Sequence, residues 1–296
     1  MSSQQPSNTV VISEALNGKE FTAESFLDYL RLSQKHWDNK ERVARFPFWL
    51  FRGHRDKAWG LCPGLWREDI KKAEPVPSCQ CEVYHRKLVL AYQAKRMSFL
   101  DKADTLGLTP SWLHRNFPLG DVDTFSEMTE ADSLAQHYGI TTHLLDWTSD
   151  PIVACYFATK PPFPHEGEQV DCCIWAFDAS EWSPTIATEI KLIDGLLNIE
   201  RPSYAANPFV QNQSGYFTYF SNTKEYFKYY GKWPRMDDYH PPSAAGVKLR
   251  KLVLKHKHVF ELRELIRKEG MTLSKAMPTL QHVADEVNQA EKLMKQ

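Results

Sequence analysis

The sequence predicts an α+β fold: a split or mixed, mainly antiparallel sheet with flanking helices at both ends of the chain. Two observations predict it. Short apolar runs typical of strands are spread along the chain and separated by longer stretches of other structure. Segments with helical apolar spacing lie near both ends, and no internal repeat or long heptad array is present. We therefore expect one domain over residues 21–290, with flexible tails at 1–20 and 291–296.

The composition is that of an ordinary globular protein. The chain has 296 residues, of which 42% are hydrophobic and 25% charged, enough for one large or two small domains. A formal net charge of −1 supplies no overall attraction to nucleic acid or to an anionic membrane. The start lacks a basic region followed by an apolar core, and no run of about twenty apolar residues occurs. We expect a cytoplasmic protein, with no membrane contact and no nucleic-acid partner.

The cysteines exclude one common kind of metal site. The chain has six of them, and none shows the paired C-x-x-C spacing of a zinc site. We interpret them as reduced, structural thiols, and we expect no bound metal.

The elements before the centre of the chain are predicted from their apolar spacing. Residues 21–30 repeat apolar side chains at helical intervals and begin with residues that can cap a helix. An aromatic run at 48–51 is typical of a buried strand, and the turn residues of 59–67 place two apolar side chains against the core. A long helix follows at 81–100, whose basic residues we interpret as a solvated face.

The stretch 134–158 is the strongest functional lead, because polar side chains interrupt an otherwise core-like run. A helical segment stops at Gly139, which suits a left-handed C-cap, and 141–147 is typical of a short strand. Asp150 is placed to accept a hydrogen bond from the first-turn amides of the next helix, and Pro151 fits its first position. The strand end and the helix start therefore form a polar mouth over an apolar floor.

A helix start of this kind attracts anions. Thr148, Ser149 and the backbone beside them are therefore candidates for holding a ligand phosphate or ribose. A structural interpretation stands beside this one for each residue. Asp146 can tie Trp147 to the loop backbone, as buried carboxylates often do, and His137 can be a satisfied structural histidine. The cluster as a whole favours a site more strongly than any single member does.

A charged residue directly after the aromatic strand is the second lead. Arg52 offers a planar fork to a phosphate or carboxylate, and Gly53 permits close approach of the backbone to a ligand. Alternatively, Arg52 pairs with a structural acid such as Asp146. His54 is the weaker candidate, because its side chain can simply face solvent.

The second half of the chain supplies the remaining predicted strands. Residues 170–177 are dense in apolar side chains and predict a central strand. A loop-rich segment at 180–208 contains a possible short helix, and its end can lie near the mouth. Residues 213–220 alternate towards a strand, 249–255 form the last strand, and an amphipathic helix ends at Gly270.

Two stretches of the chain closely resemble the signature of a known family. They are Phe51-Arg52-Gly53 and residues 136–158, which read QHYGITTHLLDWTSDPIVACYFA. The signature is that of the FRG domain family, which is named for its Phe-Arg-Gly motif. The resemblance extends more loosely to 213–217 and to the final strand and helices. His143 and Phe209 depart from it, because family members usually carry arginine at these positions.

The order of these motifs is similar to that of the ADP-ribosyltransferase fold, in which three strand-borne motifs line a cleft for NAD. This resemblance implies that Arg52 or His54 binds the dinucleotide through ribose or phosphate. It also implies that Thr148 and Ser149 form the polar motif between strand and helix, and that Gln213 takes the third position. The fold expected from the resemblance is therefore ADP-ribosyltransferase-like.

The third motif leads to the assignment of catalytic roles. Active transferases usually carry a glutamate there, and Gln213 can hydrogen-bond but cannot supply a negative charge. Asp146 is then the candidate that stabilises an oxocarbenium-like centre or acts as general base, with His137 positioning the substrate. Gly53 and Tyr138 join the expected NAD-binding residues.

The leading hypothesis is an ADP-ribosyltransferase that cleaves the nicotinamide-ribose bond of NAD, its substrate, and transfers ADP-ribose to an unknown acceptor. The alternative is a non-catalytic module that keeps the cleft and binds a nucleotide or phosphorylated metabolite. A hydrolytic or nucleic-acid-processing enzyme has little support, because the chain lacks a Gly-rich phosphate loop, a G-x-S-x-G elbow and an H-E-x-x-H helix.

Overall fold

The computed structural model describes residues 10–36, 49–72, 80–111, 113, 125, 128–160, 169–179, 197–202, 207–238 and 249–294. Its strands are β1 (Val10–Ser13), β2 (Ala15–Leu16), β3 (Lys19–Glu20), β4 (Trp49–His54), β5 (Leu145–Thr148), β6 (Cys172–Asp178), β7 (Leu197–Glu200), β8 (Gly215–Phe220) and β9 (Leu249–Leu254). Its helices are α1 (Ala23–His36), α2 (Arg67–Lys72), α3 (Cys81–Thr105), α4 (Glu130–His137), α5 (Pro151–Thr159), α6 (Pro208–Asn212), α7 (Thr223–Tyr230), α8 (Val259–Lys268), α9 (Leu273–Ala276) and α10 (Leu280–Met294). Short 3-10 turns are η1 (Gly64–Trp66), η4 (Met236–Asp238) and η5 (His256–His258).

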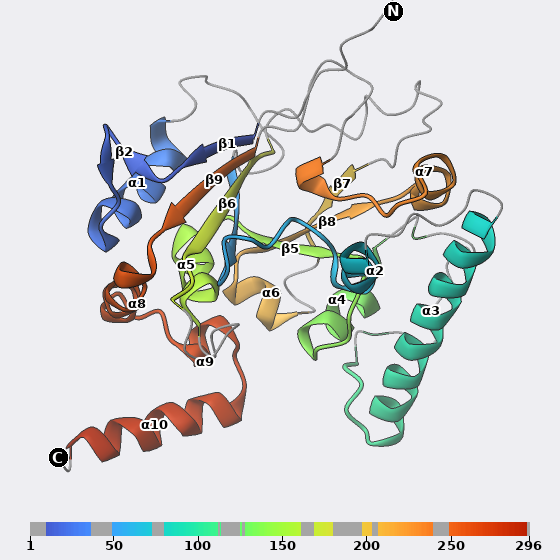
Figure 1. Ribbon diagram of the computed structural model, residues 1–296. Helices are drawn as coiled ribbons and strands as arrows, with labels where there is room; N and C mark the ends of the chain where they lie inside the picture. The colour runs from blue at the N-terminus through green and yellow to red at the C-terminus, as the bar shows by residue number, and fades with distance from the viewer. Residues whose placement is uncertain are drawn as a thin grey trace, which may run out of the picture.

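The described strands form one seven-stranded sheet in the order β1-β9-β6-β4-β5-β8-β7, with β2 and β3 as a separate ribbon (Figure 1). In the large sheet β1 and β9 are parallel, and the other neighbours are antiparallel. The prediction of a mixed, mainly antiparallel sheet with flanking helices is confirmed. Each helix in the described part of the chain is too short or too polar to cross a bilayer.

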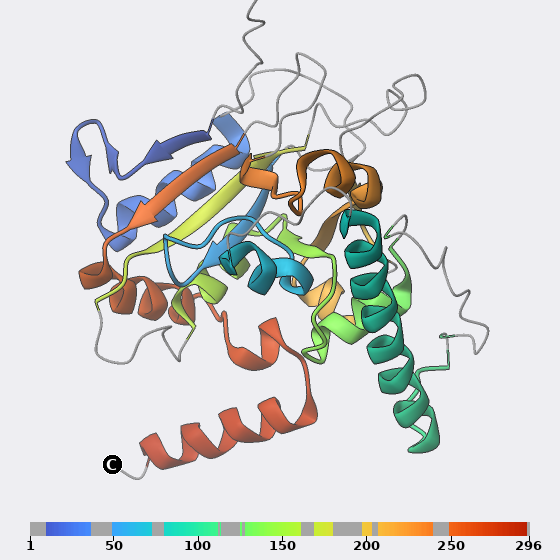
Figure 2. The same cartoon turned by 45° about the vertical axis from the view of Figure 1, so that its right-hand side comes forward.

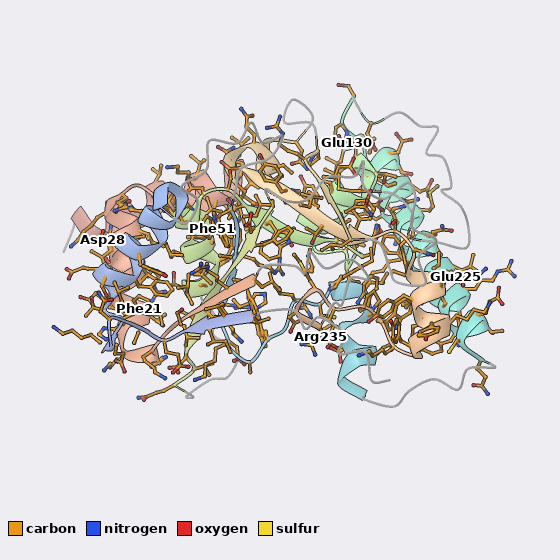
Figure 3. The ribbon with its side chains drawn as sticks, turned by 90° about the horizontal axis from the view of Figure 1, so that it is seen from above. Phe21, Asp28, Phe51, Glu130, Glu225 and Arg235 are labelled. Atoms are coloured by element: carbon orange, nitrogen blue, oxygen red, sulfur yellow. The ribbon has the colours of Figure 1, made fainter. Side chains whose placement is uncertain are left out.

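The sheet has a core on each face, because successive side chains of a strand point to opposite sides. On β4, Phe51 packs into a core shared with α1, α5 and α8, whereas Leu50 faces a core shared with α3 and α7. Figure 2 shows the long helix α3 standing at the opposite end of the molecule from α1 and α8. In the view from above, Phe21 and Asp28 lie at one end, Glu225 lies at the other, and Arg235 lies between them (Figure 3).

Strands β4 and β5 meet over a very short length. Between these two described strands, Phe51 and Thr148 are the one pair of residues in register. By contrast, β4 pairs with β6 along its whole length from Trp49 to His54. Beyond this pair the two strands separate, with Arg52 on β4 and Asp146 on β5 at the opening. The topology therefore places two of the predicted site residues on facing strands.

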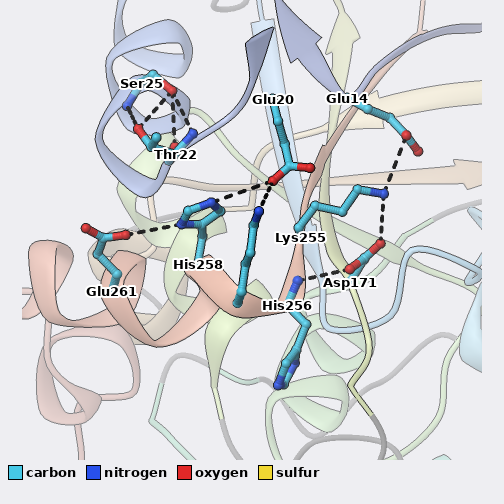
Figure 4. A network of polar contacts seen from close by, with 10 residues as sticks. Glu14, Glu20, Thr22, Ser25, Asp171, Lys255, His256, His258 and Glu261 are labelled. Carbon is cyan, nitrogen blue, oxygen red and sulfur yellow. Dashed lines mark hydrogen bonds and ion pairs between the residues drawn. The ribbon is translucent and has the colours of Figure 1, made fainter.

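Residues 10–20 belong to the folded domain, contrary to the expectation of a flexible tail. Strand β1 pairs with β9, with Val10 opposite Leu249. Figure 4 shows polar contacts around the following turn, including Lys255 Nζ to Glu14 Oε2 at 3.6 Å. Lys257 also forms an ion pair with Glu20, at 2.6 Å. An edge strand with exposed apolar residues carries no clear alternation in the sequence, which is why it was missed. At the other end, α10 extends to Met294 and so enters the expected tail at 291–296.

The local predictions around the central motif are largely confirmed. Gly139 has a φ of +83°, and Asp150 caps α5 by accepting a hydrogen bond from the Ile152 amide at 2.8 Å. The strand predicted at 141–147 starts only at Leu145. The reason is that the Thr142 hydroxyl accepts the Leu144 amide at 3.1 Å and holds the preceding residues in a turn.

Candidate functional site

A pocket of about 670 Å³ opens where β4 and β5 separate. It collects residues from β4, the loop after β4, α2, α4, β5 and α5, and it reaches the segment after α9. The predicted site residues that line it are Arg52, Gly53, His54, His137, Asp146, Thr148 and Gln213. Tyr138 and Ser149 are the two predicted site residues outside its lining.

The centre of the pocket is an ion pair between Arg52 and Asp146. Arg52 Nη1 donates to the main-chain oxygen of Asp146 at 2.8 Å and to its Oδ2 at 3.2 Å. The Arg52 side chain is only 17% exposed, whereas that of Asp146 is 46% exposed. Burial lowers the pKa of Arg52 and the nearby Asp146 opposes this shift, so the guanidinium stays charged at neutral pH. Arg52 Nη2 makes no hydrogen bond to any residue that the structure describes, so its two N–H groups are available to a ligand.

Gln136 is a site residue that the sequence analysis missed. Its Nε2 donates to Asp146 Oδ1 at 2.5 Å, and its Oε1 accepts the Thr142 hydroxyl. Asp146 is therefore held from both sides, by Arg52 on one oxygen and by Gln136 on the other. Gln136 stands in the central motif next to His137, but nothing in a single sequence indicates which of the two side chains faces the carboxylate.

His54 supports Arg52 rather than facing solvent. The residue is 4% exposed, and its Nε2 accepts the Arg52 Nε–H at 3.0 Å. Its Nδ1 must then carry the proton and donate to the Trp59 carbonyl at 3.3 Å. Burial, and then the charge of Arg52, hold the pKa of His54 well below its ordinary value. Because both ring nitrogens are occupied and the ring is neutral, His54 orients Arg52 and has no nitrogen left for a ligand.

Gly53 has a packing role. A Cβ at this position would lie 1.9 Å from the Ala154 carbonyl oxygen and 2.7 Å from the Ala158 amide nitrogen. Helix α5 therefore passes directly over β4 at Gly53, and any side chain would push the helix away. The close approach expected for a ligand is made by a helix of the protein itself.

The start of α5 is closed to anions. Thr148 Oγ1 donates to the Gln213 carbonyl at 2.6 Å and accepts the Asp150 amide at 2.9 Å, so its hydroxyl is committed to the turn. The Ser149 amide donates to the Ser214 carbonyl at 3.1 Å. The Asp150 carboxylate already occupies the helix end and would repel a phosphate. The Thr148 hydroxyl and the Ser149 amide are therefore engaged within the protein, and the phosphate site expected at these two residues stays a prediction.

The side chains of Gln213 and His137 differ in their hydrogen bonds to the described residues. Gln213 Nε2 donates to the Ala276 carbonyl at 2.8 Å and so ties the turn before β8 to α9. His137 stacks on Phe209, with ring centroids 5.0 Å apart, and its buried Nε2 has no hydrogen-bond partner among the described residues. Burial lowers the pKa of His137, which the charge of Asp146 partly offsets. Tyr138 is 59% exposed and also packs against Phe209.

Part of the pocket lies within a segment of the chain that matches a known protein family. Residues 48–167 match the family model of the FRG domain. The match supports the FRG resemblance found in the sequence, and it spans β4 to α5, including Arg52, Gln136 and Asp146. Gln213 lies outside the matched part. No curated protein and no solved structure matches the chain.

The FRG-matched part also contributes further charge and one aromatic ring to the pocket. Arg55, Trp59 and Arg67 line it, and Arg235 joins them from the turn before η4. Trp59 is 37% exposed, with the Arg55 guanidinium 5.7 Å from its ring centroid. Arginines beside an accessible indole suit a planar, anionic ligand. Within the described residues, no group of three or more His, Cys, Asp or Glu side chains is arranged to hold a metal ion.

The two positions where the chain departs from the FRG signature lie away from the pocket lining. His143 is 2% exposed and stacks on Phe125 at 5.0 Å between ring centroids. Phe209 packs on His137 from outside the lining. The positive charge of the pocket therefore comes from Arg52, which the sequence analysis singled out, and from Arg55, Arg67 and Arg235, which it did not.

Proposed function

We propose that the pocket binds NAD and that the protein is an ADP-ribosyltransferase, which cleaves the nicotinamide-ribose bond and passes ADP-ribose to an acceptor. The observation that carries this proposal is the Arg52–Asp146 pair. It combines a half-exposed carboxylate with unused guanidinium N–H groups at the opening between two strands. The short junction of β4 and β5 and the motif order Arg52, Thr148, Gln213 along the chain are in keeping with the resemblance to the transferase fold.

Cleavage of the nicotinamide-ribose bond is stabilised by a negative charge fixed beside the ribose. When the bond between ribose and nicotinamide breaks, both bonding electrons leave with the neutral nicotinamide and positive charge develops on the ribose. A carboxylate held at that point stabilises the developing charge without reorganising. Asp146 is the candidate because Gln136 and Arg52 fix its position while leaving almost half of its side chain exposed.

The ligand contacts follow from the same geometry. Arg52 Nη2 is the donor available to a ribose hydroxyl or phosphate oxygen, and His54 keeps the guanidinium in its plane. Trp59 offers an accessible face for a planar base or nicotinamide ring. His137 borders the pocket and stacks on Phe209, where it is the candidate that positions the substrate.

The test is to incubate pure protein with NAD and a panel of acceptors and to measure the release of nicotinamide by mass spectrometry. Asp146→Asn should slow the release about 100-fold or more, the size expected for loss of one transition-state stabiliser. Asp28→Asn is the matched control, because Asp28 is exposed on α1 and far from the pocket. Absence of release from the wild type, or equal release from Asp146→Asn, would overturn the proposal.

A second candidate is a module that binds a nucleotide without chemistry. It is favoured by the fact that both oxygens of Asp146 already accept hydrogen bonds and that the Gln213 amide is committed to α9. Saturable NAD binding that is lost in Arg52→Ala, with no nicotinamide released, would select this candidate over the first.

A further inference from the structure

We infer that the pocket holds a phosphate group between Arg52 and Arg67, on the side of the η1–α2 turn and away from the start of α5. This inference rests on the proposed function for the ligand-binding role of the pocket, but it does not depend on the reaction. The ligand class is a phosphorylated nucleotide whose phosphate oxygens accept hydrogen bonds from both guanidinium groups.

The balance of charge in the pocket points to Arg67. Arg52 is paired with Asp146 at 3.2 Å, and Arg235 is paired with Asp237 at 2.5 Å. Arg67 forms no ion pair with any residue in the described ranges, and its one hydrogen bond there runs from Nη2 to the Cys62 carbonyl at 3.2 Å. Arg67 therefore brings to the pocket wall a charge that no described carboxylate pairs with, next to the Glu68 side chain that lines the same wall, and the described residues leave most of its donors unused.

Arg67 is held in place by a rigid turn. The side chain of Trp66 is fully buried and its Nε1 donates to the Pro234 carbonyl at 3.1 Å. The Leu65 amide donates to the Thr142 carbonyl at 3.0 Å, which links the same turn to the segment before β5. The turn therefore fixes the backbone from which the exposed Arg67 side chain extends, and the bond from Nη2 to the Cys62 carbonyl is the side chain's contact with the described residues.

Arg52 and Arg67 line the same pocket. The charge of Arg67 contributes to the lowered pKa values of both Arg52 and His54, so the groups share one electrostatic environment. Two guanidinium groups facing one cavity repel, and an anion between them turns this repulsion into two attractions. A phosphate is the common biological group with enough charge and acceptor oxygens for both.

The alternative phosphate position is occupied by the protein's own acid. At the start of α5 the Asp150 carboxylate accepts the Ile152 amide, and Ser149 lies outside the lining. A ligand phosphate there would meet a fixed negative charge instead of free amides. The arginine side is the one left open.

The experiment is titration calorimetry of ADP, adenosine and inorganic pyrophosphate against wild type, Arg67→Gln, Arg67→Lys and Arg86→Gln. Arg86 is an exposed arginine on α3 that does not line the pocket, so it is the matched control for loss of one positive charge. We expect Arg67→Gln to weaken ADP and pyrophosphate binding about tenfold or more, since a charge-assisted contact is lost. Arg67→Lys should fall between, adenosine binding should be unchanged, and Arg86→Gln should match the wild type.

Equal ADP binding by wild type and Arg67→Gln would overturn the inference, as would an equal loss in Arg86→Gln. Thermal unfolding of each variant separates loss of binding from loss of fold. The outcomes also separate this inference from the proposed reaction. ADP binding that depends on Arg67, with no nicotinamide release, keeps the phosphate site and removes the transferase. Nicotinamide release that is unaffected by Arg67→Gln keeps the transferase and removes the phosphate site. Failure of the folded wild type to bind ADP or pyrophosphate also overturns the phosphate site.

Discussion

Two arginine–aspartate pairs in this molecule use the same groups in opposite ways. Arg96 and Asp132 join α3 to α4 at 2.8 Å, with side chains 6% and 1% exposed. Asp132 also accepts hydrogen bonds from Tyr92 and from the Thr129 amide and hydroxyl, and its own amide donates to Thr129 Oγ1 at 3.2 Å, which completes a capping box. Burial alone would raise the pKa of Asp132, but His143 and Arg96 bring it below the ordinary value.

The Arg52–Asp146 pair is open by comparison. Its distance is 3.2 Å, its carboxylate is almost half exposed, and Arg52 keeps donors that no described residue uses. A pair buried between two helices stabilises their junction, whereas a pair at the edge of a pocket, with a carboxylate that solvent reaches, can contact a ligand. The difference lies in access to solvent, since the residue types are the same and each arginine has a donor that no described residue uses.

The largest expected effect breaks the closed pair. Asp132→Ala leaves Arg96 buried without its acid and removes one half of the capping box of α4, so it should lower the free energy of unfolding by about 3–5 kcal/mol. Asp146→Ala should lower it by about 1 kcal/mol or less, because the exposed carboxylate is screened by solvent. Urea denaturation of both variants measures this contrast. Similar losses in the two variants would mean that both pairs are structural.

The wall of the pocket provides the next test. Gly53→Ala forces a methyl group against the backbone of α5 and should destabilise the fold by about 1–3 kcal/mol, as overpacking does. Gly64→Ala is its control, because a Cβ there meets Thr141 at an ordinary 3.6 Å. Denaturation curves should place Gly64→Ala close to the wild type. An unchanged Gly53→Ala would show that α5 does not press on β4 as described.

A third, smaller effect is a dependence of the free energy of unfolding on pH, caused by His54, which holds Arg52 of the open pair. His54 stays neutral in the folded protein, while in the unfolded chain it takes up a proton as the pH falls below its ordinary pKa of 6.5. Stability should therefore be lost between pH 6.5 and the lower folded pKa, by at most about 1.4 kcal/mol per pH unit for one group. His54→Gln should reduce this slope, and His137 should leave a remainder of the same sign. Denaturation at pH 7.5 and 5.5 checks the prediction, which is contradicted if His54→Gln keeps the full slope.

The smallest effect is expected at a residue that the sequence analysis assigned to the site and the structure places outside it. Tyr138→Ala removes an exposed ring that contacts Phe209 but does not line the pocket. Binding of NAD should change less than twofold, as seen by calorimetry. A large loss would extend the site beyond the pocket.

The sequence predicted most of what depends on local pattern. The capping by Asp150, the left-handed Gly139 and the buried strands carry signatures in residue type and spacing, and all three are found. The alternative that Arg52 pairs with Asp146 was also correct. These features were accessible because each is set by residues within a few positions or by a strand end.

Contacts between residues far apart in the sequence could not be predicted from local pattern. Nothing near Gly53 in the chain indicates that α5 crosses it, and nothing near His54 indicates that both of its nitrogens are used. Gln136 and Arg67 became visible as site residues only when the turn and the two strands were brought to one pocket. Gln213 was assigned by motif position, and its bond to Ala276 depends on where the C-terminal segment folds back.

The most direct test of the account is calorimetric titration of NAD into wild type, Arg52→Ala and Tyr92→Phe. Tyr92→Phe alters the closed cluster and leaves the pocket lining intact. We predict saturable binding of NAD to the wild type and to Tyr92→Phe, and binding to Arg52→Ala that is weaker by about tenfold or more. No binding to folded wild type, or equal binding to Arg52→Ala, would contradict the claim that the open pair is a ligand site.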